Sequence, residues 1–109
     1  MKTPIRHACF ADDRWYPSDP KALEDAVDSY MEQQKPGRDV LGVVSPHAGY
    51  FYSGPVAGAV YGSVNVPDRV VVIAPNHRGK GARRSVMTQG TWQIPGHNIQ
   101  IDTAFAQSF

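Results

Sequence analysis

The sequence contains a single cysteine, Cys9, so no disulfide can form within the chain and a secreted disulfide scaffold is excluded. No apolar run approaches the roughly 18 residues that a membrane-spanning helix needs, and no membrane partner is expected. The first ten residues lack the apolar core of a signal peptide. We therefore expect a cytoplasmic location, with Cys9 as a small buried or half-buried thiol.

The chain is also nearly neutral. The formal charge of the 109 residues is +1, so no global field favours nucleic acid or an anionic membrane surface. The local excess is basic and consists of four residues among glycines: Arg78, Lys80, Arg83 and Arg84. A solvated loop is the favoured interpretation of this cluster, and no nucleic-acid partner is predicted.

The first predicted helix begins at Ser18-Asp19-Pro20, where a capping side chain precedes a proline suited to the first helical position. One apolar stripe follows at helical spacing, and its members are Leu23, Ala26, Val27, Tyr30 and Met31. Residues 35–37 (Lys-Pro-Gly) are expected to end this helix.

Two short, unbroken apolar runs, 40–44 and 70–74, each have a proline one or two residues beyond their end. Such runs are typical of strands buried on both faces. Between them, residues 53–62 predict a helix that starts at Ser53-Gly54-Pro55 and ends at Gly62. The order strand, helix, strand predicts a parallel βαβ unit, and hence an α/β fold with a mostly parallel sheet and flanking helices.

The last quarter of the chain predicts shorter elements. Residues 86–93 alternate imperfectly, as in an edge strand or hairpin arm, and residues 99–101 form a second alternating piece. Asp102 resembles a helix cap, and the helix after it is expected to continue to Phe109. Because proteins seldom stop inside a capped helix, we expect residues 1–109 to be the N-terminal portion of a longer domain.

A histidine follows each predicted strand just beyond the proline: His47 after the first and His77 after the second. Ligands of open α/β sheets lie outside the carboxyl ends of the strands, so neighbouring strands would deliver both imidazoles to one crevice. Neutral imidazole is a common metal ligand. Spacing alone favours a shared metal and two polar strand-end histidines equally. Catalytic metal sites use three protein ligands, and no carboxylate or cysteine here is an obvious third.

Residues 46–55 (PHAGYFYSGP) resemble the signature of the Memo family, also called protein B of the AmmeMemoRadiSam system. Three other segments agree in order and spacing. Trp15-Tyr16-Pro17 resembles the family's aromatic-Tyr-Pro step, residues 74–77 resemble its second histidine motif, and residues 92–102 resemble its Thr-Pro-Leu-Gly segment followed by an aspartate. The resemblance covers nearly the whole chain.

The resemblance implies a fold similar to the class III extradiol dioxygenases (LigB-like), which are non-haem iron enzymes. It implies metal binding through His47 and His77, with iron or copper in the full-length protein, and it leaves open whether this fragment binds a metal. The family's third ligand, a cysteine, and a further active-site histidine belong to its second half, outside residues 1–109.

Two functions are compatible with these residues. One is a metal-dependent oxidoreductase of redox or dioxygenase type, with a pocket lined by Gly49, Tyr50, Tyr52 and Asn76. The other is a non-catalytic module that uses the same pocket for a peptide or small aromatic ligand. The fold alone does not choose between them, because function resides in the site.

The sequence departs from the family pattern at two places. Asp12-Asp13 occupy the positions of a small Ala-Gly pair, with Arg14 directly before Trp15, so the family's N-terminal packing is not carried over to this chain. Gly96 and His97 replace a Leu-Gly pair, so His97 is expected at the surface and not among the ligands.

Overall fold

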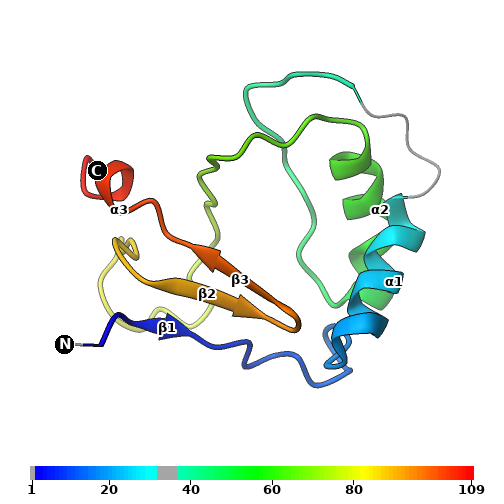
Figure 1. Ribbon diagram of the computed structural model, residues 1–109, viewed down its shortest axis with the longest axis horizontal. Coiled ribbons are helices and arrows are strands. Elements are labelled where there is room, and N and C mark those ends of the chain that lie inside the picture. The colour runs from blue at the N-terminus through cyan, green and yellow to red at the C-terminus, as the bar shows by residue number, and fades with distance from the viewer. Residues whose placement is uncertain (1, 32–36) are drawn as a thin grey trace.

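The computed structural model describes residues 2–31 and 37–109. In chain order the elements are β1 (Ile5–Arg6), α1 (Pro20–Met31), α2 (Tyr50–Gly62), β2 (Thr91–Ile94), β3 (His97–Gln100) and α3 (Thr103–Ala106). The chain is thus a small α/β unit. Helices α1 and α2 lie side by side at one end, and the sheet lies at the other (Figure 1).

Helix α1 begins where the sequence predicts. The Asp19 carboxylate accepts a hydrogen bond from the backbone N–H of Ala22 at 2.8 Å, which satisfies one free donor of the first turn. Leu23 is buried and the other members of the predicted stripe are half-buried, whereas the rest of the helix is exposed. The stripe is therefore confirmed as the packing face. The predicted end at 35–37 falls mainly on residues outside the described part.

Helix α2 starts three residues earlier than predicted, so Pro55 lies inside it and not at its first position. The reason is tertiary. The backbone N–H of Tyr50 donates to the Trp15 carbonyl at 2.8 Å, and the N–H of Ser53 donates to the Gly49 carbonyl at 3.0 Å. These hydrogen bonds form the first turn of α2 on the N-terminal side of Pro55.

The sheet is three-stranded and mixed, in the order β1-β2-β3, and the predicted mostly parallel sheet is wrong for the described residues. Strand β1 pairs with β2 in parallel, Ile5 opposite Thr91. Strand β2 pairs with β3 antiparallel, Ile94 opposite His97. The hairpin turns at Pro95-Gly96, where Gly96 has a φ of 83°, which favours glycine. The strands predicted at 86–93 and 99–101 are therefore displaced by a few residues.

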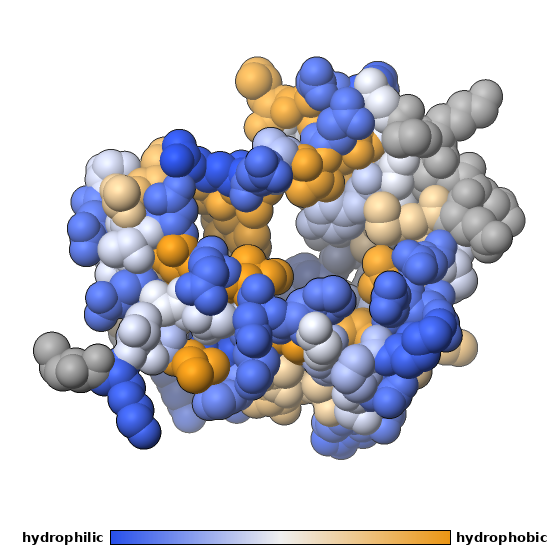
Figure 2. All heavy atoms as spheres, viewed as in Figure 1, coloured by the Kyte–Doolittle hydropathy of each residue, from blue (hydrophilic) through white to orange (hydrophobic). Residues whose placement is uncertain are grey.

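The two apolar runs, 40–44 and 70–74, form no strand. The exposed fractions of Leu41 and Ile73 are 110% and 92%, and the other large side chains of the two runs are also exposed. Hydrophobic residues line part of the rim of an opening near the middle of the face shown in Figure 2. The predicted parallel βαβ unit is wrong here, because a strand buried on both faces needs a layer on each side, and α1 and α2 pack against each other instead.

Helix α3 has the predicted cap. The Asp102 carboxylate accepts a hydrogen bond from the Phe105 N–H at 3.1 Å and an ionic hydrogen bond from Arg69 Nε at 2.7 Å. The helix ends at Ala106, short of the predicted Phe109.

Packing is loose for a chain of this size. Among the described residues, only Leu23 and Ala106 are buried hydrophobic side chains. The radius of gyration is 15.1 Å, against about 13 Å expected for a compact domain of this length. Cys9 is exposed, which corrects the expected buried thiol. In the described part of the chain, no helix is long and apolar enough to cross a membrane.

Candidate metal centre

His47 and His77 lie together. Their Nε2 atoms are 3.0 Å apart, and their rings stack with centroids 5.1 Å apart and an interplanar angle of 30°. Both residues are exposed, so a ligand or ion can reach the pair from solvent. The juxtaposition expected from the sequence is thus present, although neither histidine follows a strand.

The His47 loop is held by backbone contacts instead of a sheet. The Ser53 hydroxyl donates to the Ala48 carbonyl at 2.7 Å, which ties the residue after His47 to the first turn of α2. Gly49 is buried against the chain at 14–15, and an added Cβ would meet the Arg14 carbonyl oxygen at 3.2 Å. Together with the Tyr50–Trp15 hydrogen bond, these contacts fix where His47 leaves the backbone.

Asn76, the residue before His77, closes the loop that carries His77. The Asn76 side-chain amide donates to the Lys80 carbonyl at 2.8 Å. The Gly79 N–H donates to the Asn76 carbonyl at 3.4 Å, and Gly79 has a φ of 62°, a region that glycine adopts readily. Asn76 therefore shapes the turn that carries His77.

The predicted pocket residues separate into two environments. Tyr50 is half-buried, and its ring lies 5.6 Å from that of Tyr16 and 6.4 Å from that of Tyr30. Burial raises the pKa of the Tyr50 phenol. Tyr52 is 79% exposed and packs edge-on against Phe51, which is 83% exposed. The pocket-lining role of Gly49, Tyr50, Tyr52 and Asn76 stays a prediction.

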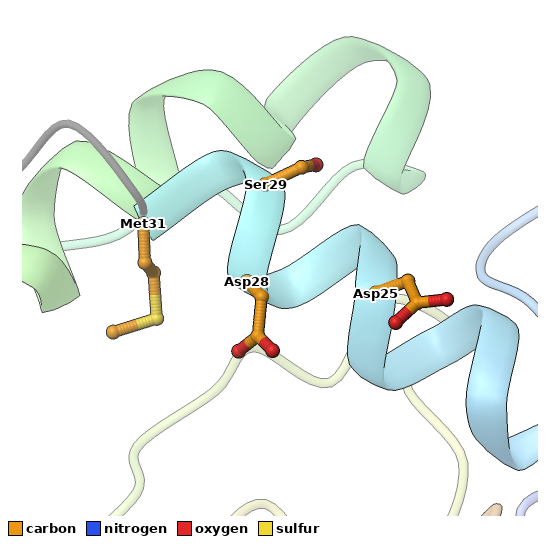
Figure 3. Close-up of a pocket in the computed structure, with 4 residues that line it drawn as sticks. All are labelled: Asp25, Asp28, Ser29 and Met31. Atoms are coloured by element: carbon orange, nitrogen blue, oxygen red, sulfur yellow. The ribbon is translucent and has the colours of Figure 1, made fainter.

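Two hollows lie away from the histidine pair. The larger is an open depression along α1 lined by Asp25, Asp28, Ser29 and Met31 (Figure 3). The smaller, of about 200 Å³, lies between α1 and the hairpin and is lined by Leu23, Val27, Tyr50 and Ile94, among others. Neither includes His47 or His77 in its lining.

The other histidines do not join the pair. His7 Nδ1 lies 2.8 Å from the side-chain oxygen of Gln93, across β1 and β2. His97 is exposed at the start of β3, as expected from the sequence. Across residues 2–31 and 37–109, no group of three His, Cys, Asp or Glu side chains is placed to hold an ion. The described residues therefore bring together two imidazoles, His47 and His77.

Sequence reasoning did not identify the contribution of Trp15 to the site. This residue acts through its backbone carbonyl, and a backbone acceptor leaves no trace in side-chain chemistry. The resemblance at Trp15-Tyr16-Pro17 was the available signal.

Comparison with known proteins identifies the family of the chain. The family model described as "Memo-like protein" matches residues 6–109. A MEMO1 family protein of Methanothermobacter thermautotrophicus is 38% identical over 106 residues, covering 86% of this chain and 38% of the relative. One from Methanopyrus kandleri is 36% identical, covering 85% and 38%. A third, from Methanosarcina mazei, is 46% identical over 72 residues, covering 66% and 27%.

The chain thus spans less than two-fifths of the length of these relatives. No solved structure matches it. The family match extends over nearly all of the sequence and includes both histidine motifs. The chain belongs to the Memo family.

Proposed function

We propose that His47 and His77 are two ligands of one divalent metal ion, iron or copper, in a Memo-type protein of redox or dioxygenase type. The observation that carries the proposal is the 3.0 Å separation of the two Nε2 atoms. A LigB-like fold for the whole protein is part of the proposal. A cytoplasmic location remains a prediction from the sequence.

The separation fits a shared ion. Zinc–imidazole nitrogen distances are about 2.0–2.1 Å, so two nitrogens bound to one ion can be no more than about 4.2 Å apart. A tetrahedral ion would place them about 3.3 Å apart. The imidazoles therefore need to part by only a few tenths of an ångström, which exposed side chains do at little cost.

A hydrogen bond explains the same distance without metal. One Nε2–H would donate to the other Nε2, which requires that only one of the two nitrogens carry a proton. Metal binding requires that neither does, since only an unprotonated nitrogen coordinates. The two explanations thus differ in where the ring protons lie, because a neutral imidazole that carries its proton on Nδ1 leaves Nε2 free for the metal.

The roles of the chain's own residues follow from their positions. His47 and His77 hold the ion from two loops, Asn76 shapes one loop, and the Tyr50–Trp15 hydrogen bond anchors the other. A bound iron or copper supplies electron transfer or a template for oxygen and substrate. The remaining coordination positions are open to ligands from outside the described residues.

A second function is favoured by one observation. Phe51 and Tyr52 form an exposed edge-on aromatic pair four and five residues after His47. Exposed aromatic rings bind peptides and small aromatic ligands through their large apolar faces. In this alternative the histidine loops form a binding site, and no catalysis occurs.

The test is calorimetric titration of copper and zinc into the 109-residue chain and into His47→Ala and His77→Ala variants. Two imidazoles without a third protein ligand should bind weakly, and copper should bind more tightly than iron or zinc. Equal loss in both variants is expected. His97→Ala is the matched control, because it removes an exposed histidine away from the pair.

Unchanged binding in either His47→Ala or His77→Ala would overturn the shared ion. Absence of metal binding, together with binding of an aromatic peptide that Phe51→Ala abolishes, would favour the second function. A longer chain that includes the family's cysteine is expected to bind metal much more tightly.

A further inference from the structure

The loop that carries His77 is strongly basic. Arg78, Lys80, Arg83 and Arg84 lie within seven residues, and no acidic residue interrupts them. The whole chain has a net charge of only +1, so the other residues together carry −3. The loop next to the proposed metal site is therefore net positive, whereas the rest of the chain is net negative.

These four side chains are exposed and lack carboxylate partners among the described residues. The ion pairs found there involve Arg14, Lys21 and Arg69. A surface cation that lacks a protein partner keeps its full charge for interaction with a ligand. Arg69, in contrast, is committed to the Asp102 carboxylate.

Chain geometry keeps the four charges close to the histidines. Arg78 is the residue next to His77, and the hydrogen bond from Asn76 to the Lys80 carbonyl closes the turn between them. Arg84 is seven residues from His77, so their Cα atoms are at most about 25 Å apart. The Debye length is about 30 Å at 0.01 M salt and about 10 Å at 0.1 M. All four charges thus act on a ligand at the histidines in dilute salt.

A cationic loop opposes the binding of a metal cation alone. Like charges repel, so Arg78, Lys80, Arg83 and Arg84 lower the affinity of the histidine pair for a divalent ion. An anion that binds beside the ion is attracted by both the loop and the metal. The local charge is consequently suited to a metal together with an anionic ligand.

We propose that the ligand of the His47–His77 site is a small organic anion, carrying carboxylate or phosphate groups, which the basic loop at 78–84 attracts. This inference rests on the proposed function, because it places the anion at the metal pair. The loop supplies charge and not fixed hydrogen bonds. Lysine at positions 83 and 84 should therefore support anion binding as well as arginine does.

The experiment titrates the trianion benzene-1,3,5-tricarboxylate into the 109-residue chain, with the imidazole signals of His47 and His77 followed by NMR. The uncharged tricarboxamide of the same shape is the ligand control. The test variant is Arg83→Gln/Arg84→Gln, whose two charges lie far enough along the loop to leave the histidines undisturbed. The matched control, Lys2→Gln/Arg38→Gln, removes the same charge from two exposed cations outside the loop that form no ion pair among the described residues.

In 10 mM salt, the test variant is expected to bind the trianion about threefold more weakly than the unmodified chain, from Coulomb's law at about 20 Å in water. In 0.3 M salt the difference should vanish. Arg83→Lys/Arg84→Lys should bind like the unmodified chain, and the matched control should weaken binding less than the test variant. The tricarboxamide should not bind. Equal affinity of the test variant and the unmodified chain in 10 mM salt would overturn the inference.

Zinc titration of the same variants separates this inference from the proposed function. The Arg83→Gln/Arg84→Gln variant should bind zinc as tightly as the unmodified chain or slightly more tightly, and the trianion should strengthen zinc binding by linkage. If zinc fails to bind while the trianion still depends on the loop, the metal proposal fails and the anion site stands. If a single-stranded oligonucleotide binds more tightly than the trianion, with a salt slope near −2.8 for four phosphates, the loop is a nucleic-acid site and the inference fails.

Discussion

Replacement of Gly58 by alanine tests how closely α1 approaches α2. A Cβ added at Gly58 would lie 2.6 Å from both the carbonyl carbon and the Cβ of Tyr30, and closer still to its carbonyl oxygen. Real Cβ contacts are essentially never below 3.0 Å. Because these atoms belong to the main chain of α1 or are attached directly to it, no rotation of a side chain can relieve the contact. The two helices must move apart.

The net effect combines two opposing terms. Overpacking of a close contact costs about 1–3 kcal/mol. Alanine gains about 1 kcal/mol over glycine in helix propensity. Since the contact is with backbone, we expect a cost at the upper end and a net destabilisation of about 2 kcal/mol, or roughly 30-fold in the opening equilibrium.

Gly54 provides the comparison. A Cβ there would lie 2.5 Å from the Tyr30 ring, which can move, whereas the backbone at Gly58 cannot. Tyr30→Ala should therefore offset the effect of Gly54→Ala but not that of Gly58→Ala, because alanine keeps the backbone and Cβ. Val56→Ala, at an exposed position of α2, controls for helix propensity.

The assay is native-state hydrogen exchange of the α2 amides, which reports the local opening free energy. The double-mutant cycles give the coupling of each glycine position to Tyr30. Exchange in Gly58→Ala that is as slow as in the unmodified chain, or equal rescue of both glycine variants by Tyr30→Ala, would refute the close backbone approach.

Three further predictions concern pH and stability. Metal affinity should fall as the pH is lowered, because His47 and His77 must be neutral to coordinate; pH-independent calorimetric affinity would contradict this. The Phe105 N–H, with help from Arg69, holds the pKa of Asp102 below its ordinary value of 3.8, so the cap contributes above that value and is lost as the pH falls through the lowered pKa. NMR of the Phe105 amide should show this transition, and Asp102→Asn, which still caps, should abolish it. The 109-residue chain should be marginally stable or prone to associate, because apolar side chains at 40–44 and 70–74 are uncovered; a sharp cooperative melt of a monomer would contradict this.

Local signals in the sequence predicted the helix starts that depend on local chemistry. Asp19 before Pro20 and Asp102 before Thr103 each accept a hydrogen bond from an N–H of the first turn, as their side chains allow. The start of α2 was misplaced, because the hydrogen bond from Tyr50 to Trp15 joins residues 35 positions apart. A prediction from local residues cannot include such a bond.

The strands predicted at 40–44 and 70–74 do not form, for a related reason. Their apolar composition predicts burial, but a strand also needs neighbours for its backbone and layers over both faces. Those partners are not supplied by the described residues. The proximity of His47 and His77 was nonetheless predicted, although the strands expected to bring them together do not form.

The contact between His47 and His77 also has a topological consequence. An ion coordinated by both side chains would cross-link the chain across a sequence separation of 30 residues. All of α2 lies within the loop that this cross-link closes. In the chain-entropy description of cross-links, closing a loop of this length removes about 3.6 kcal/mol of conformational freedom from the unfolded chain at 25 °C. For a molecule with only two buried hydrophobic side chains among its described residues, that is a substantial fraction of an ordinary folding free energy. Metal uptake and folding of this region are therefore expected to be thermodynamically coupled, with each favouring the other.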